Sequence, residues 1–251
     1  FPYTTLFRSE LGSQLLMGEV VRLLGRGPDG GWLRVRNEAD GYTGWVRAWG
    51  LVEATAARVG RWRDRAKGVV SVPLAQIRTG KGTGAAVSPV FFGDRLIVGR
   101  AVGGFRAVEL PDGRRGFLPV TALAGKRRPT IEDRVLSMLG TPYLWGGRTP
   151  AGYDCSAFVQ QVLLEQGVSL PRDAKDQCRR SRRLAAGVEP RVGDLIFFRR
   201  PGESASHVGI ALGGGYFAHS RGRVQVASLE RGNPLCDMDL LPQSMGWYRP
   251  R

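Results

Sequence analysis

Cysteine and histidine, the side chains that build disulfide frameworks and many metal centres, are scarce in this chain of 251 residues. It contains three cysteines and two histidines. Three cysteines cannot form a disulfide framework, and the spacing of Cys155, Cys178 and Cys236 matches no zinc-binding pattern. With only two histidines, a multi-histidine metal site is not expected either.

Long apolar runs and acidic residues are also in short supply. No run of about 18 uncharged apolar residues occurs, which excludes a membrane-spanning helix. Lys and Arg number 37 against 22 Asp and Glu, so the net charge is +15, while 42% of the residues are hydrophobic. This composition predicts a globular chain of one to three domains. The charge favours an anionic partner: nucleic acid, a membrane surface or an acidic polymer.

Residues 1–9 need separate treatment. Their sequence is what one reading frame of a widely used DNA-sequencing adapter would encode, so we interpret them as a non-native, adapter-derived segment and exclude them from the fold prediction. The alternative is a genuine edge strand. On the first interpretation the natural protein extends further upstream, and the lack of a signal peptide here says nothing about secretion.

The N-terminal half contains an internal repeat. Segment 14–53 has short apolar runs separated by turn residues, the pattern of a small all-β barrel, and segment 69–124 repeats it more weakly. The corresponding positions are Gly18 and Gly93, Trp32 and Phe105, and Gly44-Trp45 and Gly116-Phe117. We therefore predict an SH3-like barrel over 10–54, and a linker followed by a second barrel over 55–125. The polar, basic stretch 54–68 is the expected linker.

After residue 125 the pattern becomes helical and then extended. Thr130 is placed to cap a helix that ends at Gly140, and a second helix is expected from Asp154 or Cys155 to Gly167. Four strands are then expected, over 194–198, 207–212, 215–219 and 223–227. Helices followed by antiparallel strands predict an α+β domain over 126–251.

Cys155 has a setting suited to a nucleophile. It follows a glycine-rich loop and stands at the start of the expected helix, where unpaired N–H groups and the helix dipole favour an anion. That position is expected to lower the pKa of the thiol. The alternative is a small buried core residue, and position alone does not decide between the two.

The two histidines add a second signal. His207 opens one expected strand and His219 closes the next, and Gly213-Gly214-Gly215 forms the turn between them. An antiparallel pair with this symmetry can bring the two rings together. A base oriented by a second polar ring is the logic of a cysteine–histidine triad, so the pattern favours catalysis over two structural histidines.

The other conspicuous residues have simpler explanations. Cys178 and Cys236 are expected to be core or surface thiols. The basic run 179–183 is expected to be a solvated face. Three tryptophans of the first repeat, Trp32, Trp45 and Trp49, are expected in the barrel core rather than on a ligand platform.

Five separated motifs then suggest a family. They are TPYLWGG (141–147), YDCSAFV (153–159), LPRD (170–173), GDLIFF (193–198) and SHVGI (206–210), and over about 126–251 they resemble the NlpC-type, papain-like peptidoglycan peptidases. The preceding segments look like two bacterial SH3-like domains. This domain order is similar to that of the γ-D-glutamyl-L-diamino-acid endopeptidases, which trim cell-wall peptides.

The resemblance implies roles for particular residues. Cys155 would be the nucleophile, His207 the general base and His219 the residue that orients it, with no metal or organic cofactor. The implied substrate-binding residues are Tyr143 beside the nucleophile, Asp154 and Ser156 around it, Asp173 as the partner of a free N-terminal amine, and Tyr42 of the first barrel, which closes that end of the cleft.

The chain departs from the family pattern at a few positions. Ala157 stands where the family usually has Gly, and Ala174 replaces a Ser that commonly follows the Pro-Arg-Asp motif. The subgroup also places an acidic residue in the first barrel. Gly12 falls at that position here, and Glu10 is the nearest acidic candidate. These departures bear on recognition of the free amine more than on peptidase activity.

The implied substrate is a peptidoglycan stem peptide, L-Ala-γ-D-Glu-diamino acid, with a free N-terminus. Two alternatives stay open: an endopeptidase on intact peptidoglycan whose SH3-like modules bind the wall, and a non-catalytic wall-binding protein. Because no RNA- or DNA-reading motif is present, a nucleic-acid partner is not expected. A monomer in the bacterial envelope or outside the cell is favoured over a cytoplasmic protein.

Overall fold

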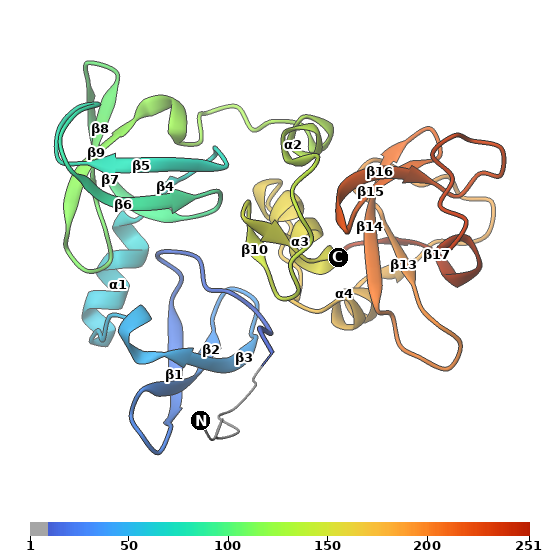
Figure 1. The fold of residues 1–251 in the computed structure, drawn as a ribbon, viewed down its shortest axis with the longest axis horizontal. Coiled ribbons are helices and arrows are strands. Elements are labelled where there is room, and N and C mark those ends of the chain that lie inside the picture. The colour runs from blue at the N-terminus through green and yellow to red at the C-terminus, as the bar shows by residue number, and fades with distance from the viewer. Residues whose placement is uncertain (1–9) are drawn as a thin grey trace, which may run out of the picture.

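The computed structural model describes residues 10–251, so the predicted adapter-derived segment 1–9 lies outside the described residues. Figure 1 shows three units: two sets of strands from the N-terminal half on the left, and a mixed helix–sheet unit on the right. The predicted α+β fold class is confirmed. Among the described residues, no helix is both long and apolar enough to cross a membrane.

The first unit is a three-stranded antiparallel sheet in the order β1-β2-β3. Its elements are β1 (Val21–Arg26), β2 (Trp32–Asn37), β3 (Thr43–Arg47) and the 3-10 turn η1 (Ala48–Gly50). Alternate residues of β2 face inward, and Leu33 and Val35 are buried. This period of two is what a half-buried strand requires.

The tryptophan prediction was wrong for two of the three residues. Trp45 is 53% exposed and Trp49 is 86% exposed, while Trp32 is half-buried. Trp45 pairs with Arg34, which is also exposed, so both side chains lie on the outer face of the sheet. Three strands enclose only a small core, and that core is filled from the opposite face.

The segment expected as a linker is helical. Helix α1 (Ala56–Arg65) begins at Thr55, whose side chain accepts a hydrogen bond from the Arg58 N–H. None of its residues is buried. Trp62 donates from its ring nitrogen to the Gly18 carbonyl at 3.0 Å, which attaches the helix to the first unit. The sequence signal was a capping Thr before a basic stretch, without the apolar stripe that usually indicates a packed helix.

The second unit is a six-stranded sheet in the order β4-β7-β8-β9-β5-β6. Its elements are β4 (Gly68–Val69), β5 (Leu74–Arg78), β6 (Ala86–Phe91), β7 (Arg95–Val102), β8 (Phe105–Glu109), β9 (Arg115–Pro119) and η2 (Val120–Ala122). Trp32 pairs with Arg47 in the first unit and Phe105 pairs with Pro119 in the second, and each hairpin is followed by a 3-10 turn. The corresponding residues found in the sequence therefore occupy matching places.

The C-terminal unit packs helices against one face of a mixed-length antiparallel sheet, in the order β12-β17-β13-β14-β15-β16. The helices are α2 (Ile131–Met138), α3 (Cys155–Glu165) and α4 (Ala174–Arg180). The strands are β12 (Arg182–Arg183), β13 (Leu195–Phe198), β14 (His207–Gly213), β15 (Tyr216–Arg221), β16 (Arg223–Ser228) and β17 (Ser244–Arg249), with η3 (Leu241–Gln243) before the last; β10 (Arg148–Thr149) and β11 (Gly152–Tyr153) form a separate hairpin.

Both predicted helices and all four predicted strands are present in this unit. Thr130 caps α2 by accepting from the Asp133 N–H, and Gly140 and Gly167 follow α2 and α3 with φ of +80° and +86°. Such left-handed positions favour glycine. Helix α4 was not predicted, because its seven residues are mainly polar and carry no apolar period.

The sheet has an apolar core on each face. Helix α3 supplies a run of fully buried residues, among them Phe158 and Val162, to the core that includes Val208 and Ile210 of β14. The other face carries a smaller core around Phe198 and Phe217. Burying α3 in this way fixes the position of its first residue, Cys155, against the sheet.

A buried ion pair and a buried cation–π pair connect the units. Arg148 is 1% exposed and forms two hydrogen bonds of 2.9 Å to the Glu19 carboxylate of the first unit. Arg134 of α2 stacks 4.3 Å from the Phe92 ring of the second unit. A buried charge that loses its partner is costly, so these pairs fix how the units dock.

Candidate active site

Cys155 is the first residue of α3, as the sequence predicted. Asp154 caps the helix by accepting from the Ala157 N–H at 2.8 Å. The thiol is 7% exposed and lies within hydrogen-bonding reach of two backbone N–H groups, those of Ser156 and Val208. Because Val208 directly follows His207 on β14, the thiol lies beside the strand end that carries this histidine.

The expected lowering of the thiol pKa was wrong. Burial is the main cause that raises the pKa of Cys155, and the neighbouring carboxylate of Asp154 is the second. The resulting pKa is about 12. The two backbone hydrogen bonds and Arg172 lower the pKa by less. The helix start therefore acts in the predicted direction, but desolvation of the thiolate outweighs it.

The two histidine rings meet, as the hairpin symmetry predicted. Nε2 of His207 lies 2.9 Å from Nδ1 of His219. The turn of Gly213, Gly214 and Gly215 has positive φ at all three residues, and the register places His219 opposite Gly209, two residues from His207. Side chains two residues apart on a strand share a face, so the rings become diagonal neighbours.

Burial keeps both rings uncharged. Desolvation, with a further contribution from the neighbouring ring, lowers the pKa of His207 to about 3, and burial lowers that of His219 to about 4. On its far side, Nε2 of His219 lies 3.3 Å from the side-chain amide of Gln225, which pairs directly with His219 in the sheet. The sequence prediction missed Gln225, although its position on the strand after His219 was a usable signal.

The Tyr143 hydroxyl is partly buried and within range of the charges of Cys155 and Asp154. Burial raises the pKa of Tyr143 to about 12, and Cys155 adds to this effect. The backbone N–H of Tyr143 donates to the Gly222 carbonyl at 2.8 Å, which fixes the loop before Gly146 and Gly147. The phenol therefore stays protonated at neutral pH and has a proton to donate near Cys155.

Asp154 and Ser156, which are predicted to contact substrate, both form hydrogen bonds within the protein. The Asp154 carboxylate accepts from the Gly146 N–H, from Ser156 and from both terminal nitrogens of Arg172, the shortest of these at 2.5 Å. Ser156 is 5% exposed and also receives a bond from Arg172. Through these hydrogen bonds the two residues position the loop and the helix start, and their contact with substrate stays a prediction.

Arg172 was missed as a site residue by the sequence prediction. It is 2% exposed, forms the bidentate pair with Asp154, and donates to Ser13 of the first unit at 2.9 Å. A signal existed, since Arg172 stands directly before Asp173 in the Pro-Arg-Asp motif. A bidentate arginine supplies geometry as well as charge, and here it ties the helix start to the N-terminal segment.

Asp173 and Tyr42 approach each other at one end of this region. Burial raises the pKa of Tyr42, with Asp173 the next cause, and burial also raises the pKa of Asp173, whose side chain is 37% exposed. A Cβ at Gly12 would lie 2.7 Å from the Tyr42 hydroxyl, so Gly12 borders the same place. Glu10 is exposed and has no described contact there.

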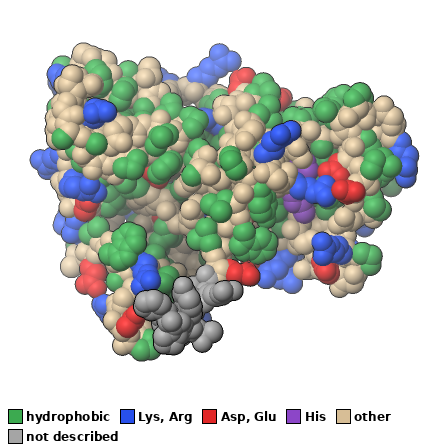
Figure 2. Space-filling view, in the orientation of Figure 1, with side chains coloured by type: hydrophobic (Ala, Val, Ile, Leu, Met, Phe, Trp, Pro, Cys, Tyr) green, Lys and Arg blue, Asp and Glu red, His purple; other side chains and the backbone are tan. Residues whose placement is uncertain are grey.

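The remaining cysteines lie elsewhere. Cys178 on α4 is half-buried with its side chain near Tyr248, and Cys236 lies near Met238. Over residues 10–251, no group of three or more His, Cys, Asp or Glu side chains is arranged to hold a metal ion. In Figure 2 histidine is visible at the surface of the C-terminal unit, next to side chains of both charges, although His219 itself is completely buried.

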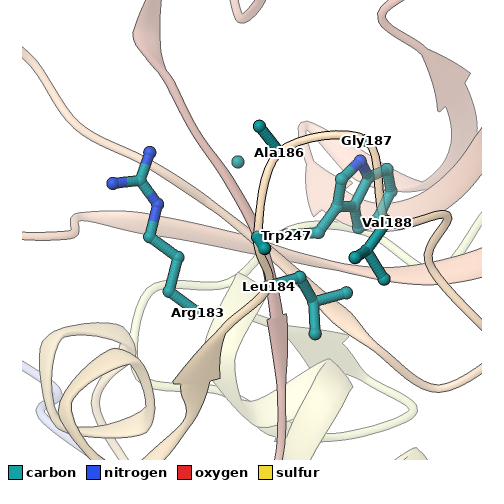
Figure 3. Close-up of a pocket in the computed structure, with 8 residues that line it drawn as sticks. Arg183, Leu184, Ala186, Gly187, Val188 and Trp247 are labelled. Carbon is teal, nitrogen blue, oxygen red and sulfur yellow. The ribbon is translucent and has the colours of Figure 1, made fainter.

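One surface cavity is separate from these residues. It measures about 450 Å³ and lies between the segment from Arg183 to Val188 and Trp247 of β17. Figure 3 shows Val188 and the Trp247 ring side by side, with Arg183 directed away from them. It contains neither the thiol nor a histidine, so the candidate active site is defined by its reactive groups and not by this cavity.

Comparison with known proteins gives two family matches. Residues 140–235 match the NlpC/P60 family, and residues 6–51 match the bacterial dipeptidyl-peptidase Sh3 domain. Among solved structures, an NlpC/P60 family protein from Bacillus cereus superposes with a TM-score of 0.78 at 23% identity, covering 95% of this chain and 81% of that one. This likeness supports the fold.

Curated relatives match over different lengths. A γ-D-glutamyl-L-lysine dipeptidyl-peptidase of Bacillus subtilis is 29% identical over 221 residues, 83% of this chain and 71% of the relative. The bifunctional muramidase/DL-endopeptidase CwlT of the same species is 36% identical over 107 residues, but this region is 41% of this chain and 32% of the relative. The second match therefore spans less than half of this chain and about a third of that relative.

The fold and these matches define a hydrolase of the cysteine-peptidase class. More particularly, the chain contains a region that matches the NlpC/P60 family, preceded by a region that matches the bacterial dipeptidyl-peptidase Sh3 domain.

Proposed function

We propose that this protein hydrolyses the bond between γ-D-Glu and the diamino acid of peptidoglycan stem peptides that have a free N-terminal L-Ala. The observation that carries the proposal is the arrangement of the His207–His219 pair and the thiol. Nε2 of His207 lies 2.9 Å from Nδ1 of His219, and the thiol lies within reach of the backbone N–H of Val208, the residue that follows His207. A nucleophile, a base and an orienting group are thus adjacent.

Cys155 attacks the carbonyl carbon of the γ-linked D-Glu. Because a pKa of about 12 for the thiol and about 3 for His207 favours the neutral form of each, the proton leaves the sulfur as attack begins. His207 uses Nε2 to contact His219, which leaves Nδ1 to receive this proton. The imidazolium then protonates the leaving amine, and the neutral ring activates the water that hydrolyses the thioester.

Tyr143 and the helix start stabilise the negative oxygen of the tetrahedral intermediate. Tyr143 retains its proton because its pKa is about 12, and it lies within range of the charge of Cys155. The first N–H groups of α3 have no partner within the helix and carry the positive end of its dipole. His219 holds the base in one tautomer, with its own Nε2 against the Gln225 amide.

Asp173 and Tyr42 recognise the free amine. Asp173 is a partly exposed carboxylate at the end of the region where Tyr42 of the first unit approaches. An ammonium group binds such a carboxylate strongly when it is partly desolvated, whereas an amide-linked L-Ala has no cation to offer. The name of the Bacillus subtilis relative, a γ-D-glutamyl-L-lysine dipeptidyl-peptidase, supports this chemistry.

The matching relatives also support a place in the cell envelope or outside the cell, because several are named as peptidoglycan or cell-wall enzymes. The first alternative is an endopeptidase on intact peptidoglycan. It needs no free amine, and the lack of an acidic residue at Gly12 is the feature that favours it.

A paired assay separates the two. The free-amine tripeptide L-Ala-γ-D-Glu-diamino acid and its N-acetylated form are given to the enzyme, and released diamino acid is measured. We expect the blocked peptide to be cleaved at least tenfold more slowly. Equal rates for the two peptides would indicate an endopeptidase that acts on intact peptidoglycan.

The second alternative is a non-catalytic wall-binding protein. Loss of turnover in Cys155→Ala but not in Cys178→Ser supports catalysis, since Cys178 lies near Tyr248 and has no described hydrogen bond to either histidine. No turnover by the wild-type chain on any stem peptide, blocked or free, would favour the binding protein.

A further inference from the structure

The outer face of the β1-β2-β3 sheet has an unusual composition. Residues directly opposite each other in antiparallel strands share a face, so the register defines the outward positions. They are Arg22, Gly25, Trp32, Arg34, Arg36, Thr43, Trp45 and Arg47, which we name the Arg-Trp face. Four arginines and two tryptophans occupy these eight positions, and no acidic residue is present.

The arginines of this face have no acidic partner among the described residues. Neighbouring Arg26 pairs with Glu53 and Arg63 with Glu38, but no ion pair involves Arg22, Arg34, Arg36 or Arg47. The segment 1–9 contains no Asp or Glu that could supply one. Four like charges on one small sheet repel one another, and among the described residues no ion pair offsets this cost.

The aromatic rings are interleaved with these charges. The Arg47 guanidinium lies 4.1 Å from the Trp32 ring centre, and Trp45 is 53% exposed directly opposite Arg34. A small surface cavity of about 240 Å³ continues the face toward the turn that carries Tyr42; it is bordered by Arg22, Arg36, Asn37, Glu38 and Gly41, and the Glu38 carboxylate there is paired with Arg63. Flat rings beside fixed cations suit a ligand that alternates rings with negative charges.

We propose that the Arg-Trp face binds an anionic sugar–phosphate polymer of the bacterial cell wall. Arginine guanidinium groups bind phosphate oxygens, often with two hydrogen bonds, and the tryptophan rings stack on sugar rings. The face would hold the enzyme at the wall while the cleft acts on small peptides. The binding chemistry of this face does not depend on the proposed function. The proposed function is used only to choose a wall polymer over a nucleic acid as the ligand.

The test uses the full chain and four probes. These are bacterial walls that carry a phosphodiester polymer, the same walls after acid removal of that polymer, a single-stranded polynucleotide at equal phosphate concentration, and anionic phospholipid vesicles. Binding is measured by co-sedimentation with the walls and vesicles and by fluorescence anisotropy with the polynucleotide.

The test variant combines Arg22→Gln, Arg34→Gln and Arg47→Gln, and leaves Arg36 in place because it lies against the Gly41 turn. The matched control removes three exposed arginines elsewhere, with Arg100→Gln, Arg200→Gln and Arg231→Gln. Trp45→Ala is a third variant. Thermal melting and hydrolysis of a soluble tripeptide show that each variant folds, and melting alone serves if the proposed activity is absent.

The salt dependence gives the expected size of the effect. Each phosphate contact is expected to contribute roughly 0.7–0.9 to the slope of log affinity against log salt concentration. A face that makes four such contacts should therefore bind the polymer about 50–150-fold more weakly at about 200 mM salt than at about 50 mM. The triple variant, with one contact left, should lose only about 3-fold in affinity over the same salt range. The control variant should show the same salt dependence as the wild type. Trp45→Ala weakens binding without changing the salt slope.

These results support the proposal when polymer-bearing walls bind and stripped walls do not. Equal binding to stripped walls would overturn it, as would equal salt slopes for the triple variant and its control. Tighter binding to the polynucleotide or to vesicles than to the wall polymer would assign the face to that other partner and would also overturn the proposal.

Discussion

The buried pair of Arg172 and Asp154 is expected to be worth several kcal/mol, because each side chain depends on the other. The Arg172 side chain is 2% exposed, its two terminal nitrogens contact both carboxylate oxygens of Asp154, and that carboxylate also organises Gly146 and the start of α3. Removing one member of such a pair costs about 3–5 kcal/mol, since it leaves an uncompensated buried charge. We therefore expect Arg172→Met to lower the free energy of unfolding by that amount.

The double variant Asp154→Asn, Arg172→Met makes this reasoning testable. It removes the stranded charge, so it should be more stable than Arg172→Met alone by about 1–3 kcal/mol, a coupling expected for residues in direct contact. Urea unfolding followed by tryptophan fluorescence measures each free energy, and Arg172→Lys is the control that keeps the charge but not the bidentate geometry. A loss below about 1 kcal/mol in Arg172→Met, or a double variant no more stable than it, would refute the reasoning.

Three further predictions concern the histidine pair and the amine end of the cleft. Because the pKa of His219 is about 4 in the fold against about 6.5 when unfolded, the unfolded chain binds more protons, and the contribution of His219 to stability should fall by about 3 kcal/mol as the pH drops from 6.5 through 4. The lowered pKa of His207 acts in the same direction, so His219→Gln should make this acid limb less steep, without abolishing it, in unfolding measured at each pH. Tyr42→Phe should raise KM for the free-amine peptide about 3–10-fold with little change in kcat, and an unchanged KM would remove Tyr42 from the binding site. In Gly209→Ala the new Cβ would lie 2.7 Å from the Phe217 ring, so it should disturb the strand that aligns the rings of His207 and His219. We expect kcat to fall at least tenfold in steady-state kinetics, while a far-UV spectrum shows that the variant is folded.

Local patterns predicted much of the C-terminal unit. Thr130 with Gly140, and Asp154 with Gly167, bounded two helices because capping and left-handed glycine are properties of a few adjacent residues. The three-glycine turn allowed the meeting of His207 and His219 to be predicted, since hairpin symmetry converts sequence distance into spatial register.

Long-range burial could not be predicted in the same way. The position of Cys155 at a helix start was visible in the sequence, but its pKa depends on how completely the strand of His207 and Val208 covers it. Arg172 likewise became a site residue only through its distant partners Asp154 and Ser13. Trp45 and Trp49 are exposed because three strands have too small an interior for them, a limit set by tertiary structure and not by residue type.

The nucleophile is the central claim, and the most direct measurement is the mass of the enzyme quenched in acid during turnover of the free-amine stem peptide. The account predicts a covalent adduct with the mass of an L-Ala-γ-D-Glu acyl group, located by peptide mapping on Cys155 and absent from Cys155→Ala, which also releases no diamino acid. Turnover that persists in Cys155→Ala, or an adduct on Cys178 or Cys236, would contradict it.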